Sequence, residues 1–185
     1  MITTRKQLRE YIEADMSRYK KRKNYLSYFF FGDETFAIRR FLKIWRKTEF
    51  YYNTLNKKNF FALLRFSFYF VLYRRMQLQY KLFLPLNVVG PGLYIPHRMG
   101  GVIINAIKVG SQFTISSGCI IGKKDSNENR PIIGNNVTCH IGSKVIGRVT
   151  IGDNAIIAPN SVVVKDVPAG DVVSGIPAKS IKKVV

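Results

Sequence analysis

The sequence contains few of the residues that most often carry metal or redox chemistry. Its 185 residues include two cysteines and two histidines. Cys119 and Cys139 lie twenty residues apart and form no CxxC pair, so we expect no metal site and no disulfide. The first residues, MITTRKQLREYIEAD, are too charged for a secretory signal. We therefore expect two free thiols in a reducing, cytoplasmic compartment.

Long apolar runs are also missing. The longest, residues 59–73, contains 15 residues and is interrupted by Arg65, whereas a membrane-spanning helix needs about 20. Residues 1–82 contain no proline and a single glycine, Gly32, and they lack the alternation typical of strands. This pattern predicts helices over residues 35–52 and 59–79.

Acidic residues are scarce, which makes the chain strongly basic. Lys and Arg number 30 against 11 Asp and Glu, a net charge of +19, and residues 1–82 hold 19 of the 30 basic residues. Basic and aromatic side chains are interleaved over residues 19–25 and 36–47. Such a surface attracts anionic lipid headgroups or another polyanion. Solvated helix faces and a contact with the inner face of a membrane both stay open, and we expect no nucleic-acid partner.

The apolar face of residues 59–79 leaves a related choice. It contains Phe60, Phe61 and Leu64, and one short helix cannot bury such a face alone. Either it packs against the rest of the protein or a neighbouring subunit, or it lies on a membrane surface.

The second half of the chain has a six-residue repeat. Steps of six from Ile103 reach apolar residues at ten of eleven positions, namely Ile103, Val109, Ile115, Ile121, Ile133, Cys139, Val145, Ile151, Ile157 and Val163. The exception, Asn127, lies in a polar run that predicts a loop over residues 123–131. Three short strands per coil, with the apolar residue inward, build a triangular prism. We predict a mainly β protein: a left-handed parallel β-helix over residues 85–185 behind an N-terminal α-helical region over residues 1–84.

A prism of this kind cannot bury its own ends and flat faces, so it needs caps or oligomerisation. We expect the helical region to cap the N-terminal end. Residues 164–179 leave the repeat and should form an edge strand or a loop folded back on the last coils. Cys119 and Cys139 should fill the prism as small, inert side chains.

Four segments of this half are distinctive. They are Gly90-Pro91-Gly92-Leu93-Tyr94-Ile95-Pro96-His97, the insertion after Ile121-Gly122, residues 151–168, and Gly175-Ile176-Pro177-Ala178-Lys179. Together they resemble the serine acetyltransferase family, and more narrowly its shorter relatives in capsule and surface polysaccharide biosynthesis. The resemblance implies an acetyl-CoA-dependent acyltransferase that forms a homotrimer, with the coenzyme in a groove between adjacent prisms.

Direct acyl transfer from a thioester to a hydroxyl needs a base, and histidine suits this task at cytoplasmic pH. His97 matches the family's histidine near the thioester, and we expect a backbone carbonyl to orient it. The other histidine, His140, is either a bystander or a contact to substrate or coenzyme.

The resemblance also implies binding residues. It places Gly122, Gly142 and Ser143 along the pantetheine arm of CoA. It places Lys165 and Lys179 at the adenine and phosphate end, although either lysine could simply be solvated. The candidate contacts to the acceptor are Asn105, Arg130 and His140.

Two departures from the family pattern shape the functional prediction. The carboxylate that supports the base in serine acetyltransferases aligns with Leu82, and the Arg-His pair linked to holding serine aligns with Asn129-Arg130. We therefore predict O-acetylation of a sugar hydroxyl in a capsule or surface polysaccharide or its precursor. The alternatives are serine O-acetylation for cysteine biosynthesis, and a non-catalytic trimeric scaffold that binds membrane or nucleic acid.

Overall fold

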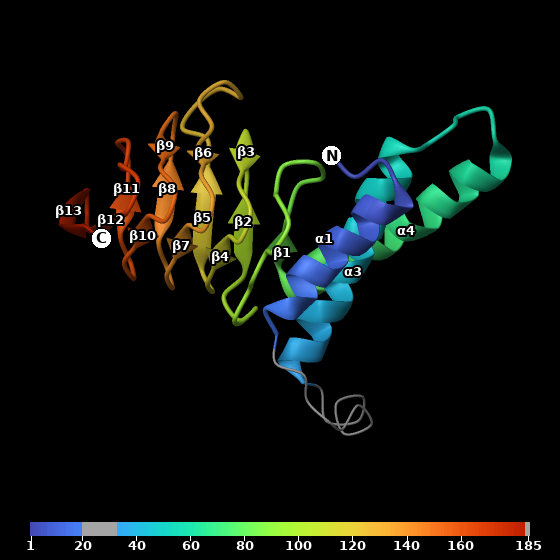
Figure 1. Cartoon of the computed structure of the whole chain (residues 1–185), viewed down its shortest axis with the longest axis horizontal. Coiled ribbons are helices and arrows are strands. Elements are labelled where there is room, and N and C mark those ends of the chain that lie inside the picture. The colour runs from blue at the N-terminus through green and yellow to red at the C-terminus, as the bar shows by residue number, and fades with distance from the viewer. Residues whose placement is uncertain (20–32, 184–185) are drawn as a thin grey trace.

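The computed structural model describes residues 1–19 and 33–183, so most of the predicted basic-aromatic segment 19–25 lies outside the described residues. Three helices adjoin a column of short parallel strands (Figure 1). The helices are α1 (Arg5–Ser17), α3 (Glu34–Asn53) and α4 (Phe60–Tyr80). The last two confirm the helices predicted over residues 35–52 and 59–79, whereas α1 was not predicted as a separate helix.

The helices begin where the sequence supplies side-chain caps. Thr4, Asp33 and Asn59 each accept a backbone N–H of the first turn, and such caps fix the start of a helix. Asp33 accepts from the N–H of Phe36 at 2.9 Å and thereby sets Glu34 as the first residue of α3.

The strands form three sheets that wrap around one axis. Sheet A has the order β1-β2-β5-β8-β11, sheet B β3-β6-β9 and sheet C β13-β12-β10-β7-β4. All pairings are parallel except that between β12 and β13. The strands are β1 (Leu82–Phe83), β2 (Val102–Ile104), β3 (Lys108–Val109), β4 (Thr114–Ile115), β5 (Cys119–Gly122), β6 (Ile132–Ile133), β7 (Thr138–Cys139), β8 (Lys144–Ile146), β9 (Thr150–Ile151), β10 (Ile156–Ile157), β11 (Val162–Val163), β12 (Asp171–Gly175) and β13 (Ala178–Lys183).

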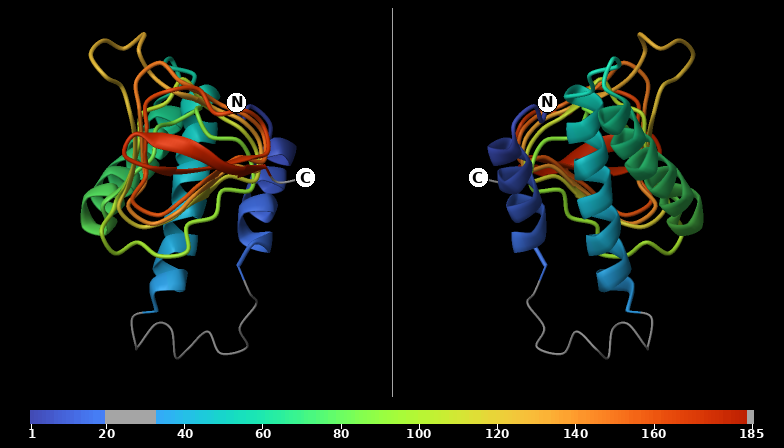
Figure 2. Two further views of the ribbon diagram at one scale, coloured as in Figure 1. Left: turned by 90° about the vertical axis from the view of Figure 1, so that its left-hand side faces the viewer. Right: turned by 90° about the vertical axis from the view of Figure 1, so that its right-hand side faces the viewer.

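Seen along its axis, the column has a triangular outline (Figure 2). The chain passes from sheet A to B to C and back to A in each coil. We call the turns from sheet C to sheet A the C–A corner (residues 96–101, 116–118, 140–143 and 158–161). The turns from sheet A to sheet B are the A–B corner (residues 84–88, 105–107, 122–131, 147–149 and 164–166), and residues 123–131 stand out from it as the predicted loop.

The inward register agrees with the repeat at all but one predicted position. From Val109 onward, every apolar residue of the hexad series is buried. Ile103, however, is 41% exposed, and the prediction that it points inward is wrong. Its neighbours Val102 and Ile104 are buried instead. The cause is a shorter step: Ile104 pairs with Ile121, 17 residues on, whereas Ile133 pairs with Ile151 after the full 18.

The end of the column away from the helices is closed by a hairpin. Strand β13 folds back antiparallel on β12 and forms the edge of sheet C, which confirms the predicted edge segment. Cys119 and Cys139 are free and buried, as expected of small fillers inside the prism. Burial raises the pKa of both thiols, so neither is a reactive thiolate at neutral pH.

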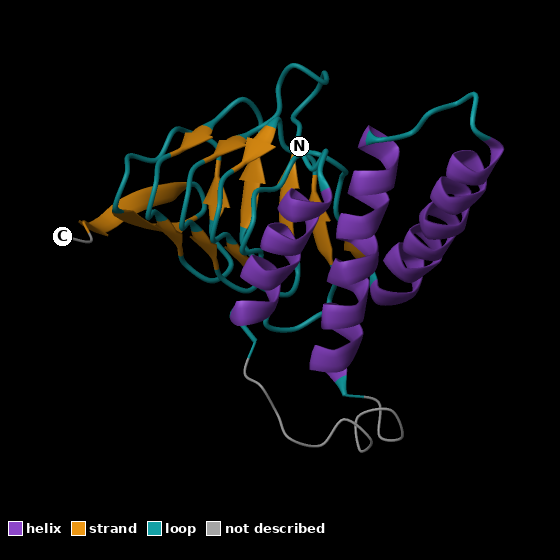
Figure 3. Ribbon diagram, turned by 45° about the vertical axis from the view of Figure 1, so that its right-hand side comes forward, coloured by secondary structure: helices purple, strands orange, loops and turns teal. Residues whose placement is uncertain are grey.

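The helical region lies against the first coil, as predicted (Figure 3). Phe41, Leu42 and Trp45 of α3 are fully buried in one core with Leu82 and Leu84 of the first coil. The indole Nε1 of Trp45 donates to the backbone oxygen of Pro85 at 3.2 Å. No helix among the described residues combines the length and the apolarity needed to cross a membrane.

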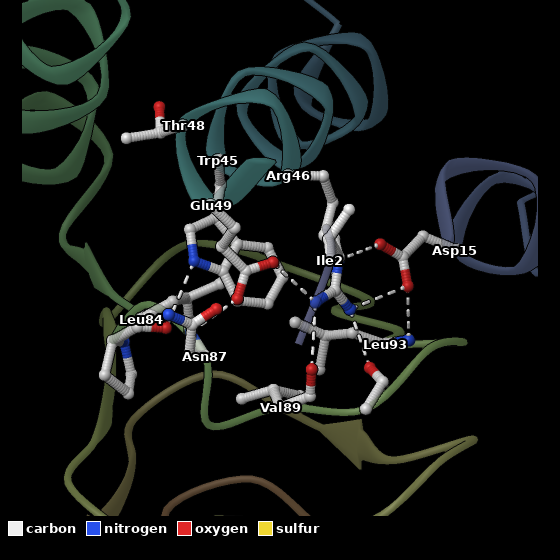
Figure 4. A network of polar contacts seen from close by, with 12 residues as sticks. Ile2, Asp15, Trp45, Arg46, Thr48, Glu49, Leu84, Asn87, Val89 and Leu93 are labelled. Carbon is white, nitrogen blue, oxygen red and sulfur yellow. Dashed lines mark hydrogen bonds and ion pairs between the residues drawn. The ribbon is translucent and has the colours of Figure 1, made fainter. Parts of the chain in front are cut away.

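A buried arginine joins α1 to α3 (Figure 4). The guanidinium of Arg46 on α3 donates to Asp15 of α1 at 2.8 Å and to Glu49 at 2.9 Å, and the side chains of all three residues are 2% exposed or less. Burial alone would lower the pKa of Arg46, but the two carboxylates raise it above its ordinary value. The arginine therefore stays charged inside the core.

The same cluster also binds the backbone of the first coil. Arg46 donates to the carbonyl oxygens of Val89 at 2.9 Å and Gly90 at 2.6 Å. Asp15 accepts the N–H groups of Gly92 and Leu93, both at 2.8 Å. These bonds satisfy backbone groups at the end of the column that no further coil covers.

Candidate functional site

His97 lies at the C–A corner of the first coil, next to the start of α3. Its side chain is 71% exposed. Its backbone oxygen accepts the hydroxyl of Ser117, one coil further along the column, at 3.0 Å. The ring is therefore carried on a backbone that is tied to the prism, while the imidazole itself faces outward.

The partner of this ring is a carboxylate from the helical region. Glu34 Oε2 lies 3.1 Å from His97 Nδ1. The second oxygen of Glu34 accepts the backbone N–H groups of Arg98 at 2.6 Å and Met99 at 3.3 Å. Glu34 thus holds the ring and the turn that follows it, so that α3 and the first coil build the site together.

The environment keeps this carboxylate ionised. Partial burial alone would raise the pKa of Glu34, but the N–H of Arg98, the side chain of His97 and the N–H of Met99 together lower it below its ordinary value. The position at the first residue of a helix acts in the same direction, because helix N-termini favour negative charge. At neutral pH the Glu34 side chain beside the His97 ring is therefore a carboxylate.

The pair has the geometry of an oriented base. A carboxylate next to Nδ1 favours the tautomer that carries its proton on Nδ1, which leaves Nε2 as the acceptor. We expected a backbone carbonyl in the orienting position, and that prediction is wrong, since Glu34 occupies it. Leu82, which aligns with the family's carboxylate, is fully buried in sheet A.

Glu34 was not predictable as a site residue from the sequence, and the reason is physical. It stands 63 residues before His97 and belongs to a helix. Its only signal in the sequence was an acidic residue at a helix start, which any helix favours. The docking of α3 on the first coil, and not the repeat, brings the two side chains together.

His140 lies at the same corner as His97 but two coils further along. The register runs from Tyr94 through Thr114 to Thr138, so His97 and His140 differ by two strand spacings, or roughly 10 Å. The side chain of His140 is exposed. Its backbone oxygen accepts the thiol of Cys119 at 2.9 Å, which fixes the turn. The two histidines share one edge of the prism without forming a pair.

The next two predicted residues at this corner differ in what they offer a ligand. Gly142 has a φ of +71°, and an added Cβ would collide with Asn160 of the next coil, so glycine is needed for the stacking of the turns. Ser143 is 1% exposed, and its hydroxyl lies 3.3 Å from the Cys119 sulfur inside the prism. Its side chain therefore faces the interior of the prism, and only the backbone of Ser143 is left for the predicted contact with CoA.

Four of the other predicted residues, Asn105, Gly122, Arg130 and Lys165, lie at the A–B corner, at the opposite end of the strands of sheet A. Asn105 and Gly122 occupy this corner in successive coils, and the N–H of Asn105 donates to the oxygen of Ile121 at 2.8 Å. Arg130 ends the loop there and donates to the Asn127 oxygen at 2.7 Å. Lys165 follows β11 at the same corner and is exposed.

One chain therefore does not assemble the predicted residues into one site. His97 and His140 lie at the C–A corner, at one end of the strands of sheet A, and the loop with Arg130 and Lys165 lies at the A–B corner, at the other end. Lys179 is exposed on β13, at the edge of sheet C. Among the described residues, no three His, Cys, Asp or Glu side chains are grouped as metal ligands.

Comparison with known proteins supports the repeat. Residues 130–165 match the family described as bacterial transferase hexapeptide (six repeats). The chain is 38% identical over 97 residues to a serine acetyltransferase of Helicobacter pylori strain J99, a match that covers 51% of this chain and 57% of that protein. The matched region spans about half the length of such curated relatives.

Solved structures support the fold over the whole chain. The serine acetyltransferase of Neisseria gonorrhoeae in complex with serine has a TM-score of 0.64 at 24% identity, covering 96% of this chain and 70% of that one. The serine acetyltransferase of Brucella abortus strain S19 in complex with coenzyme A has a TM-score of 0.65 at 24% identity, covering 96% of this chain and 67% of that one. These likenesses imply a left-handed β-helix with N-terminal helices, as predicted.

The comparisons overturn the predicted acceptor. The curated relatives and the structural neighbours named above are serine acetyltransferases. The preference for a capsule or surface polysaccharide rested on the missing carboxylate at Leu82 and on the altered Arg-His pair. Glu34 supplies a carboxylate to the base from a different element. The prediction of a sugar hydroxyl as acceptor is therefore wrong, and the alternative of serine is the better supported one.

Proposed function

We propose that the chain transfers an acetyl group from acetyl-CoA to the hydroxyl of serine. The observation that carries the proposal is the His97–Glu34 pair, with Nδ1 3.1 Å from the carboxylate and the ring 71% exposed. The similarity to serine acetyltransferases supplies the donor and acceptor classes. Direct transfer needs no covalent enzyme intermediate if both substrates are held together.

In the proposed reaction, His97 Nε2 removes the proton of the serine hydroxyl as that oxygen attacks the thioester carbonyl. The tetrahedral intermediate collapses with cleavage of the carbon–sulfur bond. The imidazolium returns the proton to the leaving thiolate, so the products are O-acetylserine and CoA. Glu34 acts as a positioning residue: it fixes the ring and stabilises the imidazolium that forms in between.

We further propose that the complete site lies between two protomers of a trimer. The base stands at the C–A corner, and Arg130 and Lys165 stand at the A–B corner. A groove between adjacent prisms would set one edge of a protomer beside a different edge of its neighbour. In that arrangement Lys165 of one copy would hold a phosphate of CoA, and Arg130 of the same copy would contact the acceptor, near His97 of another.

The first test is CoA release from acetyl-CoA with free serine, for the wild type and His97→Ala. The proposal expects release that depends on serine and falls about 10²- to 10⁴-fold in the variant, the usual contribution of a general base. Lys57→Gln, an exposed change in the α3–α4 turn, serves as the matched control. Serine-independent release would overturn serine as the acceptor, and absent release would overturn the proposal and favour a non-catalytic scaffold.

The shared site has its own test. His97→Ala and Arg130→Ala trimers are each expected to have low activity. Unfolding and refolding them together gives mixed trimers, in which some grooves combine an intact His97 with an intact Arg130. Activity that reappears on mixing supports a site between protomers. If mixing restores nothing while both parents form trimers, the two corners do not serve one site.

A further inference from the structure

The outer face of α4 is an uncovered aromatic and aliphatic stripe. The opposite face of this helix packs on α3, which lies between α1 and α4 (Figure 3). The side chains of the outer face are between 56% and 73% exposed. They are Phe60, Phe61, Leu64, Phe68, Val71 and Leu78.

Helical geometry places these residues on one side. Steps of three, four and three residues from Phe61 through Leu64 and Phe68 to Val71 follow the period of an α-helix, and a step of seven then reaches Leu78. From Phe60 to Leu78 the stripe is roughly 27 Å long. A contiguous apolar surface of this size is uncommon on a soluble monomer and marks a contact with another body.

Arginines lie beside the stripe and, at Arg75, within its C-terminal part between Val71 and Leu78, and no acid of α4 compensates them. Arg65, Arg74 and Arg75 are exposed along α4. Residues 50–124 contain no Asp or Glu at all. Arg65 lies over the Tyr51 ring at 5.7 Å and, with Arg5, lines a pocket between α3 and α4. The helix therefore combines exposed aromatic rings with uncompensated positive charge.

We infer that this face of α4 binds the surface of an anionic phospholipid bilayer, with the helix lying parallel to the membrane plane. Aromatic and aliphatic side chains enter the boundary between headgroups and acyl chains, while arginines extend to the phosphates. Negative lipids attract each nearby cation by about 1 kcal/mol. The binding is peripheral, since α4 does not have the character of a spanning helix.

The charge distribution argues against the α4 face of a second copy as the occupant. Two α4 faces packed on each other would bring the arginines of both copies into one interface. Because neither helix contributes an acid, those charges would lose water without gaining a partner. A bilayer with anionic headgroups supplies the missing negative charge.

The position of α4 suits this contact. The helix lies at the end of the molecule opposite the β12–β13 hairpin (Figure 1). The column of strands would then point away from the lipid, with His97 near the membrane end.

The test is co-sedimentation of the full chain with vesicles of phosphatidylcholine alone and of phosphatidylcholine mixed with phosphatidylglycerol. We expect binding to the mixed vesicles only, weakened by salt. Replacing Arg65, Arg74 and Arg75 with Gln should lower the partition coefficient about a hundredfold. Phe61→Ser with Phe68→Ser should lower it at least about tenfold.

The control changes exposed cations at other places: Arg148→Gln, Lys165→Gln and Lys182→Gln together should alter binding less than about twofold, although three positive charges are removed in both variants. Equal losses in control and test variants would mean that only overall charge matters, which overturns the inference. So would absence of vesicle binding by the wild type. Sedimentation without lipid completes the test by measuring the oligomeric state. If the wild type forms an oligomer and the variant with Phe61→Ser and Phe68→Ser does not, a second copy of the chain and not a bilayer covers this face.

Discussion

Replacement of Glu34 by Gln separates the positioning role of this residue from a merely structural one. Gln keeps the size of the side chain and one oxygen for the N–H groups of Arg98 and Met99, but it removes the negative charge beside His97. At about 4 Å, a pair of charges is worth between about 1 kcal/mol in water and about 4 kcal/mol near a protein surface. The side chains here are 71% and 28% exposed, so screening favours the lower end.

A loss of about 1 kcal/mol of imidazolium stabilisation corresponds to a five- to tenfold fall in kcat/KM. The assay is serine-dependent CoA release as a function of pH. The pKa of Glu34 is lowered in the folded protein. The negative charge of its carboxylate is therefore fully present above the ordinary pKa of about 4.3, and it is lost only as pH falls through the lower folded-state pKa. Throughout the neutral range the wild type thus keeps the charge, and the acid limb of the rate profile should move to lower pH in the variant.

Two comparisons make the prediction refutable. Asp33→Asn removes the same charge one residue away and should leave the acid limb in place. In a double-mutant cycle, Glu34→Gln should add almost nothing to His97→Ala, because the carboxylate acts through that ring. Full additivity of the two losses, or an unmoved pH profile with the activity reduced, would show that Glu34 only supports the fold.

Three further predictions concern the fold. Arg46→Met should lower the free energy of unfolding by about 3–5 kcal/mol, because it leaves two buried carboxylates without their cation; urea denaturation followed by circular dichroism measures this, and a loss below about 1 kcal/mol would contradict it. Cys119 and Cys139 should not react with Ellman's reagent in the native protein and should react fully in denaturant, since burial raises the pKa of both thiols. Ile157→Ala should cost about 2–5 kcal/mol and Ile103→Ala less than about 1, since the first side chain is buried and the second is 41% exposed; similar losses at both positions would contradict the observed register.

The repeat made the prism predictable, because its information is local. A period of six residues fixes both the turn and the inward side chain, and each coil repeats the choice, so positions from Val109 to Val163 were placed correctly. The spacing between β2 and β5 was not predictable in this way. It is one residue shorter than the full step of 18, so the register extrapolated back from Val109 failed by one residue at Ile103.

Of the two residues that pair in the candidate site, only His97, at the start of the repeat region, was predictable from the sequence. His97 stands beside a recognisable motif, whereas its partner Glu34 belongs to a helix whose docking depends on contacts far apart in the sequence. The inward turn of Ser143 was missed for another reason. Alignment with relatives places a residue along a surface, but the pleat of the adjacent strand decides which way its side chain points.

The hydrogen bonds from Arg46 to the backbone of the first coil affect the order in which the molecule unfolds locally. Each coil exchanges backbone hydrogen bonds only with the coils next to it, so the column frays from its ends. One end is held by a buried ion cluster and three helices, while the other is held by a single hairpin. Hydrogen exchange should therefore begin at β12 and β13 and reach the turn of His97 last. His97 is then carried by the part of the chain expected to stay folded longest, and partial opening of the far end should leave His97 and Glu34 in place.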